Sequence, residues 1–318
     1  MARQRHEGRD AGDGDAAGPD VNGSTGRGPA RRAAILPGLH LVATPIGNAR
    51  DITLRALDTL AGCDAIAAED TRVTMRLMEM HGIARADRPM IAYHDRNAAE
   101  ARPRLMRLLA EGRAVAYCSD AGTPLVADPG FRLVGAAIAE DVAVHALPGP
   151  SAALAALAVS GLPSDRFLFA GFPPSKSGSR RRFLSELAAV PATLILFESP
   201  HRVVDSVADM ARILGAARDV ALARELTKRF ETVRRMTLGT LAETLAHEGA
   251  PKGEIVLVLG PPLVAEAPSD AEIDAAIDAR LAYETTRDAA AAVAAVLGLP
   301  RRQIYARALE RARVLGKR

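Results

Sequence analysis

Short apolar stretches alternate with stretches of helical periodicity along the first half of the chain, from Leu39 onward. The apolar stretches predict strands at 39–43, 64–69, 90–95, 114–119 and 142–147. Between them, apolar residues three to four positions apart predict helices at 51–62 with Asp51 as the cap, at 71–82, at 98–112 and from about residue 130. Strands that alternate with helices typically form a largely parallel, covered sheet. We therefore predict an α/β domain over residues 35–148.

A second α/β domain is predicted over residues 149–262, after Pro148 and Pro150. Its apolar stretches predict strands at 167–172, 194–199 and 220–225, a strand with a turn at 229–241, and a closing strand at 253–260. Helical periodicity at 180–189 and 202–214 places helices between these strands.

The two ends of the chain have different patterns. Residues 1–34 are rich in Gly, Asp, Arg and Ala and hold almost no large apolar side chain. Burial cannot offset the entropy of ordering such a segment, so we predict a disordered tail. Residues 263–318 begin as a Pro-containing linker and continue with helical periodicity. A Gly-Leu-Pro turn at 298–300 lies between two of these helices, which is the outline of a helix-turn-helix module.

Composition excludes several classes of protein. The 318 residues contain no apolar run near the ~18–20 residues of a membrane span, and no apolar signal core begins the chain. Only two cysteines are present, without metal-binding spacing, which favours the reducing cytoplasm and predicts no metal. A net charge of +3 is compatible with an RNA partner, whereas 3% aromatic residues and no Trp disfavour a binder that stacks single strands.

The ends of four predicted strands are dense in Gly, Pro and small polar residues. These loops are ATPIGNARD (43–51), AEDTR (68–72), SDAGTPLVADPG (119–130) and LPGPSA (147–152). Ligands of open α/β sheets bind outside the carboxyl ends of the strands, so these loops are the candidate site. The chain has neither a GxxxxGK[ST] nor a GxGxxG motif, and acidic loops repel phosphates. The ligand is therefore expected to carry hydroxyls, an amine or a sulfonium cation rather than to be ATP or NAD.

Six ordered motifs in the chain resemble those of the ribosomal RNA small subunit methyltransferase I family, a branch of the tetrapyrrole-methylase superfamily. The motifs are TPIGNARDIT, AEDTR, SDAGTPLVADPG, PGPSA, FAGFPP and ESPHR. The resemblance implies a two-domain fold with a cofactor cleft between the domains, followed by a helix-turn-helix-like module. It further implies a cytoplasmic homodimer that uses S-adenosylmethionine to methylate the ribose 2′-hydroxyl of a cytidine in the decoding region of 16S rRNA.

The same resemblance assigns residues to the cofactor. In this chain Thr123 stands where the superfamily has an aspartate, and Asp120 is the nearby acid that would compensate. The cofactor-binding residues implied by the matching motifs are Pro45, Asp120, Ala121, Gly122, Thr123, Val126, Ser151, Ala152, Glu198 and Leu226.

A weak nucleophile such as a ribose hydroxyl is helped by a general base, and several residues remain candidates for that role. Glu69, Asp70 and Arg72 are the predicted catalytic residues, and the identity of the base stays open between Glu69, Asp70, His94 and Glu225. The predicted RNA contacts are the cations that follow FAGFPP, because phosphate contacts dominate RNA affinity. They are Lys176, Arg180, Arg181 and Arg182.

Two other functions remain open from the residues alone. A methylase of a tetrapyrrole-like small molecule would share the cofactor cleft but would not need the basic cluster. A non-catalytic RNA-binding protein would use the C-terminal module and would have no affinity for a methyl donor. For three further residues we prefer a structural role: His40 and His145 as hydrogen-bonded strand residues, and Asp128 as a cap of the helix that begins near Gly130.

Overall fold

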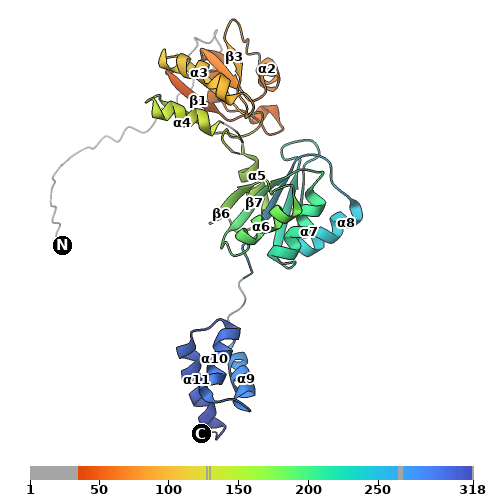
Figure 1. The fold of residues 1–318 in the computed structure, drawn as a ribbon. Coiled ribbons are helices and arrows are strands. Elements are labelled where there is room, and N and C mark those ends of the chain that lie inside the picture. Colours follow the sequence, from red (N-terminus) through yellow and green to blue (C-terminus); the bar gives the residue numbers. More distant parts are fainter. Residues whose placement is uncertain (1–34, 127, 129, 264–267, 317–318) are drawn as a thin grey trace, which may run out of the picture.

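The computed structural model describes residues 35–126, 128, 130–263 and 268–316 (Figure 1). The tail predicted to be disordered, residues 1–34, lies outside the described residues. Two five-stranded sheets and a group of C-terminal helices make up the described chain, which confirms the predicted α/β fold with a helical module. The division of the chain at residues 148 and 262 stays a prediction.

The first sheet is entirely parallel, with the strand order β3-β2-β4-β1-β5. Its strands are β1 (Gly38–Val42), β2 (Ala65–Ala68), β3 (Met90–Ala92), β4 (Ala114–Cys118) and β5 (Val144–Leu147). The helices are η1 (Ala49–Asp51), α1 (Leu54–Gly62), α2 (Thr71–Met80), α3 (Ala98–Ala110) and α4 (Phe131–Ala139). Apolar side chains of α3 and α4 pack on one face of the sheet and those of α1 and α2 on the other.

Asp51 does not cap the first long helix, which corrects the prediction for that residue. Asp51 ends the short turn η1, and α1 begins three residues later. Thr53 is the cap, because its hydroxyl oxygen accepts a hydrogen bond from the N–H of Ala56 at 3.2 Å. Threonine and aspartate are both favoured N-cap residues, so the sequence did not separate the two.

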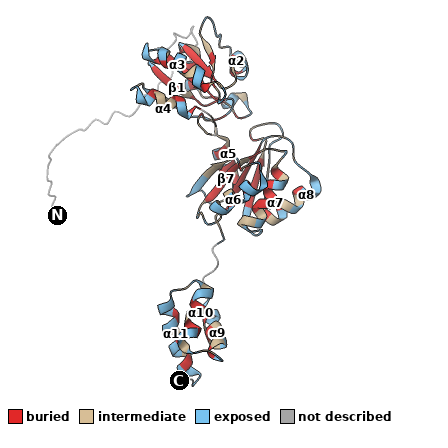
Figure 2. Cartoon of the chain, viewed as in Figure 1, coloured by how far each residue is buried: buried red, intermediate tan, exposed pale blue. Residues whose placement is uncertain are grey.

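The second sheet is mixed, with the strand order β6-β7-β10-β8-β9, and only β6 and β7 run parallel. Its strands are β6 (Phe167–Gly171), β7 (Thr193–Glu198), β8 (Asp219–Arg224), β9 (Thr232–Thr237) and β10 (Ile255–Leu259). The helices are α5 (Ala152–Ser160), α6 (Ser177–Leu187), α7 (Val203–Leu214) and α8 (Leu238–Glu248). Helices α6, α7 and α8 cover one face and α5 covers the other, so the central strands are buried on both sides (Figure 2).

Two helices of this unit were not predicted. Helix α5 has the sequence AALAALAVS, which is apolar on nearly every side and therefore lacks the period that signals an amphipathic helix. Helix α8 follows β9 directly, where the sequence suggested a turn. Thr237 ends the strand and also caps the helix, because its hydroxyl oxygen accepts from the N–H of Thr240 at 3.3 Å.

The C-terminal helices form a module with its own apolar core. They are α9 (Asp270–Leu281), α10 (Thr286–Leu297) and α11 (Arg301–Val314). Ile277, Val293 and Ile304 bring one buried side chain from each helix into this core. Gly298 ends α10 with a φ of 65°, a left-handed conformation that suits glycine, and the predicted helix-turn-helix form is confirmed. No helix among the described residues has the length and apolar character needed to cross a membrane.

Candidate functional site

The loops that follow β1 and β4 are joined by a pair of backbone hydrogen bonds. The N–H of Thr44 donates to the carbonyl of Gly122 at 3.0 Å, and the N–H of Gly122 donates to the carbonyl of Thr44 at 2.9 Å. Gly122 has a φ of 82°, and a Cβ added there would lie 3.3 Å from Cγ2 of Ile46. Position 122 therefore needs glycine both for its backbone conformation and for the close approach of Ile46.

Two buried hydroxyl groups hold these two loops together, and a half-buried one connects them to the second unit. Thr44 Oγ1 donates to the carbonyl of Ser119 at 3.1 Å, and Ser119 Oγ donates to the carbonyl of Gly122 at 3.1 Å. Thr123 Oγ1 donates to the carbonyl of Pro150 at 2.9 Å. Three of the four predicted loops thus contact one another. The hydroxyl of Thr123 makes the contact between the loop after β4 and the loop that contains Pro150.

The acidic loop after β2 lies against Asp120. The N–H of Asp70 donates to Oδ1 of Asp120 at 2.8 Å, while the N–H of Asp120 donates to Oε2 of Glu69 at 3.2 Å. Partial burial raises the pKa of Glu69, and the nearby Asp120 carboxylate acts in the same direction. A carboxylate with a raised pKa is a stronger proton acceptor than an ordinary one at neutral pH.

Asp70 and Arg72 form a local pair. Arg72 donates from Nε and from one terminal nitrogen to the two oxygens of Asp70, at 3.0 and 2.6 Å. Asp70 also caps α2 by accepting from the N–H of Arg72 at 2.9 Å. The hydrogen bonds from Arg72 lower the pKa of Asp70 to about 2. Of the two predicted catalytic carboxyls, Glu69 has a raised pKa, whereas Asp70 has a lowered one and caps α2. A catalytic role for Glu69, Asp70 and Arg72 stays a prediction.

A cavity of about 460 Å³ opens beside these loops. Its walls come from both α/β units: the loop at 44–47, helix α2 and Asp120 and Ala121 from the first, and Lys228 and Glu254 from the second. A smaller cavity of about 30 Å³ shares Ile46 and Glu254 with it. The predicted cofactor residues that line one cavity or the other are Pro45, Asp120, Ala121, Ala152 and Leu226.

Lys228 lines the larger cavity and was not predicted as a cleft residue. Its ammonium group donates to Glu225 Oε1 at 2.9 Å and to Glu254 Oε2 at 3.0 Å. Burial lowers the pKa of Lys228, but the hydrogen bonds to the two carboxylates outweigh it and the net pKa is raised. Glu225 and Thr227 hold positive φ angles of 54° and 63°, a conformation that costs on the order of 1–3 kcal/mol for a residue other than glycine. Such strain is typical of functional loops.

Five of the predicted cofactor residues line neither cavity: Gly122 and Thr123, whose contacts are described above, and Val126, Ser151 and Glu198. Val126 is half-buried in the loop after β4, and Ser151 caps α5 by accepting from the N–H of Leu154 at 3.4 Å. The buried carboxylate of Glu198 accepts from the hydroxyl of Ser206 at 2.5 Å and pairs with Arg202 at 2.8 Å. The contacts of Glu198 stabilise the start of α7. A cofactor role for all five residues stays a prediction.

Arg180 is corrected from an RNA contact to a structural residue. It is only 5% exposed, and its guanidinium pairs with Asp209 at 2.7 Å. Arg181 is half exposed and donates to the same carboxylate at 2.8 Å. Lys176 and Arg182 are exposed. A phosphate therefore has access to Lys176, Arg182 and part of Arg181, but not to Arg180.

The structural roles predicted for the two histidines are confirmed, whereas Asp128 does not cap α4 as predicted. The rings of His40 and His145 stack with centroids 4.5 Å apart, and each ring bonds to a backbone carbonyl. Asp128 Oδ1 accepts from the N–H of Gly130 at 2.6 Å, but Gly130 is itself the cap residue of α4, and the helix has no side-chain cap hydrogen bond from a described residue. The same oxygen accepts from the hydroxyl of Tyr117, so Asp128 also anchors the long loop to β4.

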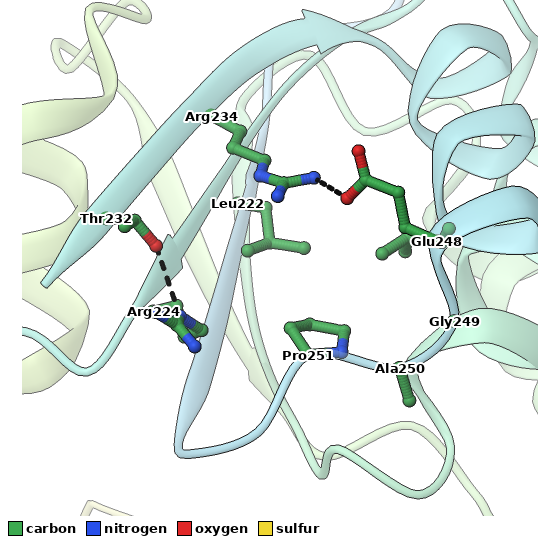
Figure 3. A pocket seen from close by; sticks show the side chains of 9 residues that line it. Leu222, Arg224, Thr232, Arg234, Glu248, Gly249, Ala250 and Pro251 are labelled. Carbon is green, nitrogen blue, oxygen red and sulfur yellow. Dashed lines mark hydrogen bonds and ion pairs between the residues drawn. The ribbon is translucent and has the colours of Figure 1, made fainter. Parts of the chain in front are cut away.

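A separate pocket of about 230 Å³ lies between β8, β9 and the end of α8 (Figure 3). Arg224 Nε donates to Thr232 Oγ1 at 3.2 Å, and Arg234 pairs with Glu248 at 2.6 Å. The two guanidinium groups are therefore engaged by the pocket's own walls. No predicted site residue lines this pocket, and we assign it no role.

Comparison with known proteins adds family information to this geometry. Residues 38–242 match the family model described as "Tetrapyrrole (Corrin/Porphyrin) Methylases", and residues 267–312 match the one described as "RsmI C-terminal HTH domain". The chain is 52% identical over 276 residues to the "Ribosomal RNA small subunit methyltransferase I" of Mesorhizobium japonicum, covering 86% of this chain and 92% of that protein. It is 43% identical over 273 residues to the protein of the same name from Escherichia coli O157:H7, covering 86% and 94%.

Solved structures share the fold at low sequence identity. A diphthine synthase superposes with a TM-score of 0.55 at 16% identity, covering 70% of this chain and 89% of that one. A cobalt precorrin-4 methyltransferase superposes with a TM-score of 0.52 at 17% identity, covering 70% and 94%. The pair of sheets in this chain is therefore an arrangement found in solved proteins.

Proposed function

Because the chain belongs to the ribosomal RNA small subunit methyltransferase I family, we propose that it methylates the ribose 2′-hydroxyl of a cytidine in 16S rRNA. S-adenosylmethionine is the methyl donor, and the decoding region of the assembled small subunit holds the target. The observation that carries the proposal is the cavity shared by both units, which lies beside a glutamate with a raised pKa. The family relatives and the C-terminal match support RNA as the substrate class.

The residues around the two cavities fit S-adenosylmethionine. Small or apolar walls at Pro45, Ala121, Ala152 and Leu226 suit its adenosine and methionine parts. Asp120 supplies a carboxylate in the same cavity, which attracts a sulfonium or an amine. When bound, the donor supplies an electrophilic methyl group on sulfur.

The protein's own residues would position the ribose and accept its proton. Glu69 is the proposed base, because its carboxylate lies next to Asp120 and has a raised pKa. The pair of Asp70 and Arg72 shapes the loop that carries Glu69. Accurate positioning of a nucleophile contributes up to ~7–11 kcal/mol in favourable cases, so most of the acceleration is assigned to the fit of the cleft.

RNA is proposed to lie over the exposed cations at the start of α6. Lys176 and Arg182 have no hydrogen bond or ion pair with another described side chain, so both are available to phosphates. Arg181 shares Asp209 with Arg180 and contributes in part. Replacing Lys176 and Arg182 with glutamate is expected to weaken RNA binding and to make it less sensitive to salt.

The proposed reaction is tested with small ribosomal subunits from a strain that lacks this protein. Labelled methyl groups from S-adenosylmethionine should enter 16S rRNA, and mapping by nucleotide should place them on one cytidine ribose. Transfer to a tetrapyrrole instead of to subunits would identify a small-molecule methylase. RNA retention without heat of donor binding in calorimetry would identify a non-catalytic RNA-binding protein.

A homodimer and a cytoplasmic location are proposed with the same function. Small subunits are assembled in the bacterial cytoplasm, so an enzyme that methylates them acts there. The edge strand β6 exposes Phe167 and Leu168, and Phe172 follows it at 52% exposure, which provides apolar surface for a second copy. Light scattering at micromolar concentration should give about twice the 33.5 kDa chain mass. A monomer at that concentration would refute the proposed homodimer but would not contradict the proposed reaction.

A further inference from the structure

The C-terminal module exposes tyrosines that the rest of the described chain buries. The sequence contains four tyrosines, and Tyr93 and Tyr117 have no exposed surface. Tyr283 is 75% exposed and Tyr305 is 41% exposed. The low aromatic content disfavours base stacking by the protein as a whole. This argument does not apply to a module in which the aromatic rings are concentrated on the surface.

Both exposed rings line one cavity of about 780 Å³, together with Arg287 and Leu309. Tyr283 lies between α9 and α10, whereas Tyr305 and Leu309 are four residues apart on α11 and so share one side of that helix. Arg301 and Arg302 precede Tyr305 by four and three residues and extend the same side. We call this surface the tyrosine face; its residues are Tyr283, Arg287, Arg301, Arg302, Tyr305 and Leu309.

The opposite side of α11 is already occupied. Arg307 and Arg311 form ion pairs with Asp274 and Asp278 of α9, and Arg307 also pairs with Asp270. These ion pairs hold α11 against α9, and they occupy the guanidinium groups of Arg307 and Arg311. The outward side of α11 remains solvent-exposed in Figure 2.

The cations of the tyrosine face have no such partners. Arg287, Arg301 and Arg302 are exposed, and none forms a hydrogen bond or ion pair from its side chain to another described residue. Of the nearby acids, Asp288 accepts from the hydroxyl of Thr285. Glu284, which also lines the cavity, pairs with Arg280 through Oε1, while its buried Oε2 has no hydrogen-bond partner in the described part of the chain. Free guanidinium groups beside exposed rings fit a polyanion that also carries flat bases.

On the premise of the proposed action on ribosomal RNA, we propose that the tyrosine face binds unpaired nucleotides of that RNA. The bases stack on Tyr283 and Tyr305, and the phosphates contact Arg287, Arg301 and Arg302. Unpaired nucleotides are chosen over a duplex because the major groove of A-form RNA is too deep and narrow for a helix such as α11. The tyrosine face thus holds the subunit while the cleft acts on the ribose.

The test uses the full-length protein and a labelled, single-stranded RNA of twelve mixed nucleotides. Replacing both tyrosines (Tyr283→Ala with Tyr305→Ala) should raise the Kd for this RNA about tenfold or more, because stacking on each ring is lost. The paired phenylalanine variants keep the rings and should stay within about twofold of the original. Val296→Ala, an exposed apolar truncation on α10 outside the cavity, is the matched control and should change nothing.

Salt dependence and turnover provide independent readouts. Replacing Arg287 and Arg302 with glutamine should make the slope of log K against log salt shallower by about 1.4, or about 0.7 for each phosphate contact with a single strand. Methyl transfer at saturating small subunits should be unchanged in the tyrosine variants, with only the KM for subunits increased. Thermal melting should show that the phenylalanine and alanine variants remain folded.

An unchanged Kd for the single-stranded RNA in the double alanine variant would overturn the proposal. If that variant bound naked RNA normally but lost affinity for intact subunits, the partner would be a ribosomal protein and the proposal would be wrong. Absence of methyl transfer by the unaltered protein would refute the proposed function instead, and the two failures are therefore distinguishable.

Discussion

Gly47 lies directly beneath the side chain of Lys228. A Cβ added at position 47 would be 2.5 Å from Cγ of Lys228, 2.8 Å from Oγ1 of Thr227 and 3.0 Å from the carbonyl oxygen of Leu226. The next residue, Asn48, donates its N–H to Oγ1 of Thr227 at 3.1 Å. The loop after β1 and the strained loop after β8 are thus packed together at the wall of the cleft.

Gly47→Ala is expected to weaken donor binding about tenfold or more, because the added methyl group must displace Lys228 or the 226–227 backbone. Overpacking of this kind typically costs about 1–3 kcal/mol of stability. Calorimetry with S-adenosylmethionine and urea unfolding measure the two effects. Gly135→Ala is the control, since it lies within α4 with nothing within 4 Å of its added Cβ, and it should bind the donor normally. Normal donor binding by Gly47→Ala would remove this loop contact from the site.

The pair of Asp70 and Arg72 should make stability depend on acid pH. Hydrogen bonds from Arg72 hold the pKa of Asp70 at about 2, below its ordinary 3.8. The stabilisation is therefore present above pH 3.8 and is lost as the pH falls toward 2. Arg72→Gln should be less stable than the original protein in urea at pH 6, and the difference should shrink by pH 3.

Arg76→Gln is the control for this measurement, because Arg76 is exposed on the same helix. It should show no difference from the original protein at either pH. The difference in the free energy of unfolding between Arg72→Gln and the original protein should not stay constant from pH 6 to pH 3. A constant difference would contradict the assignment of the acid transition to Asp70.

The part of the site that comes from the first α/β unit was predictable because the sheet of that unit is parallel. The carboxyl ends of β1, β2, β4 and β5 meet at one edge, so the loops that hold Pro45, Glu69 and Asp120 had to come together. No such rule covers the second sheet, in which β10 runs antiparallel to both of its neighbours. Lys228 lies in the loop between β8 and β9, and Glu254 lies just before β10, so their place in the cleft was missed.

Side-chain direction explains the wrong prediction for Arg180. A run of cations in the sequence indicates charge but does not say which members face the core. Arg180 is four residues before Leu184, and both are buried on the inner side of α6. The apolar spacing of Leu184 and Leu187 extends back to position 180, so helical periodicity was the signal that could have identified the buried arginine.

Arg180→Met is expected to destabilise the protein by about 3 kcal/mol, because it leaves Asp209 buried with only part of its charge compensated. Arg182→Met removes an exposed cation from the same helix and should change stability by less than about 0.5 kcal/mol. The effects on RNA affinity should be the reverse, with affinity reduced in Arg182→Met and not in Arg180→Met. Urea unfolding and RNA titration of both variants measure these differences. Equal free energies of unfolding for the two variants would contradict the structural role of Arg180 and make it an RNA contact again.

Glu69→Gln is expected to lower kcat about 10²–10⁴-fold while the Kd for S-adenosylmethionine stays unchanged, because Glu69 is the proposed base and does not line the donor cavity. Burial raises the pKa of Glu69, so its contribution to stability is present below the ordinary pKa of 4.5 and is lost as the pH rises through the raised value. The glutamine variant should therefore be at least as stable as the original protein at pH 7, which separates lost chemistry from damaged folding. Glu79→Gln, on the exposed side of α2, should retain normal kcat. Unimpaired turnover by Glu69→Gln would show that positioning alone activates the ribose hydroxyl.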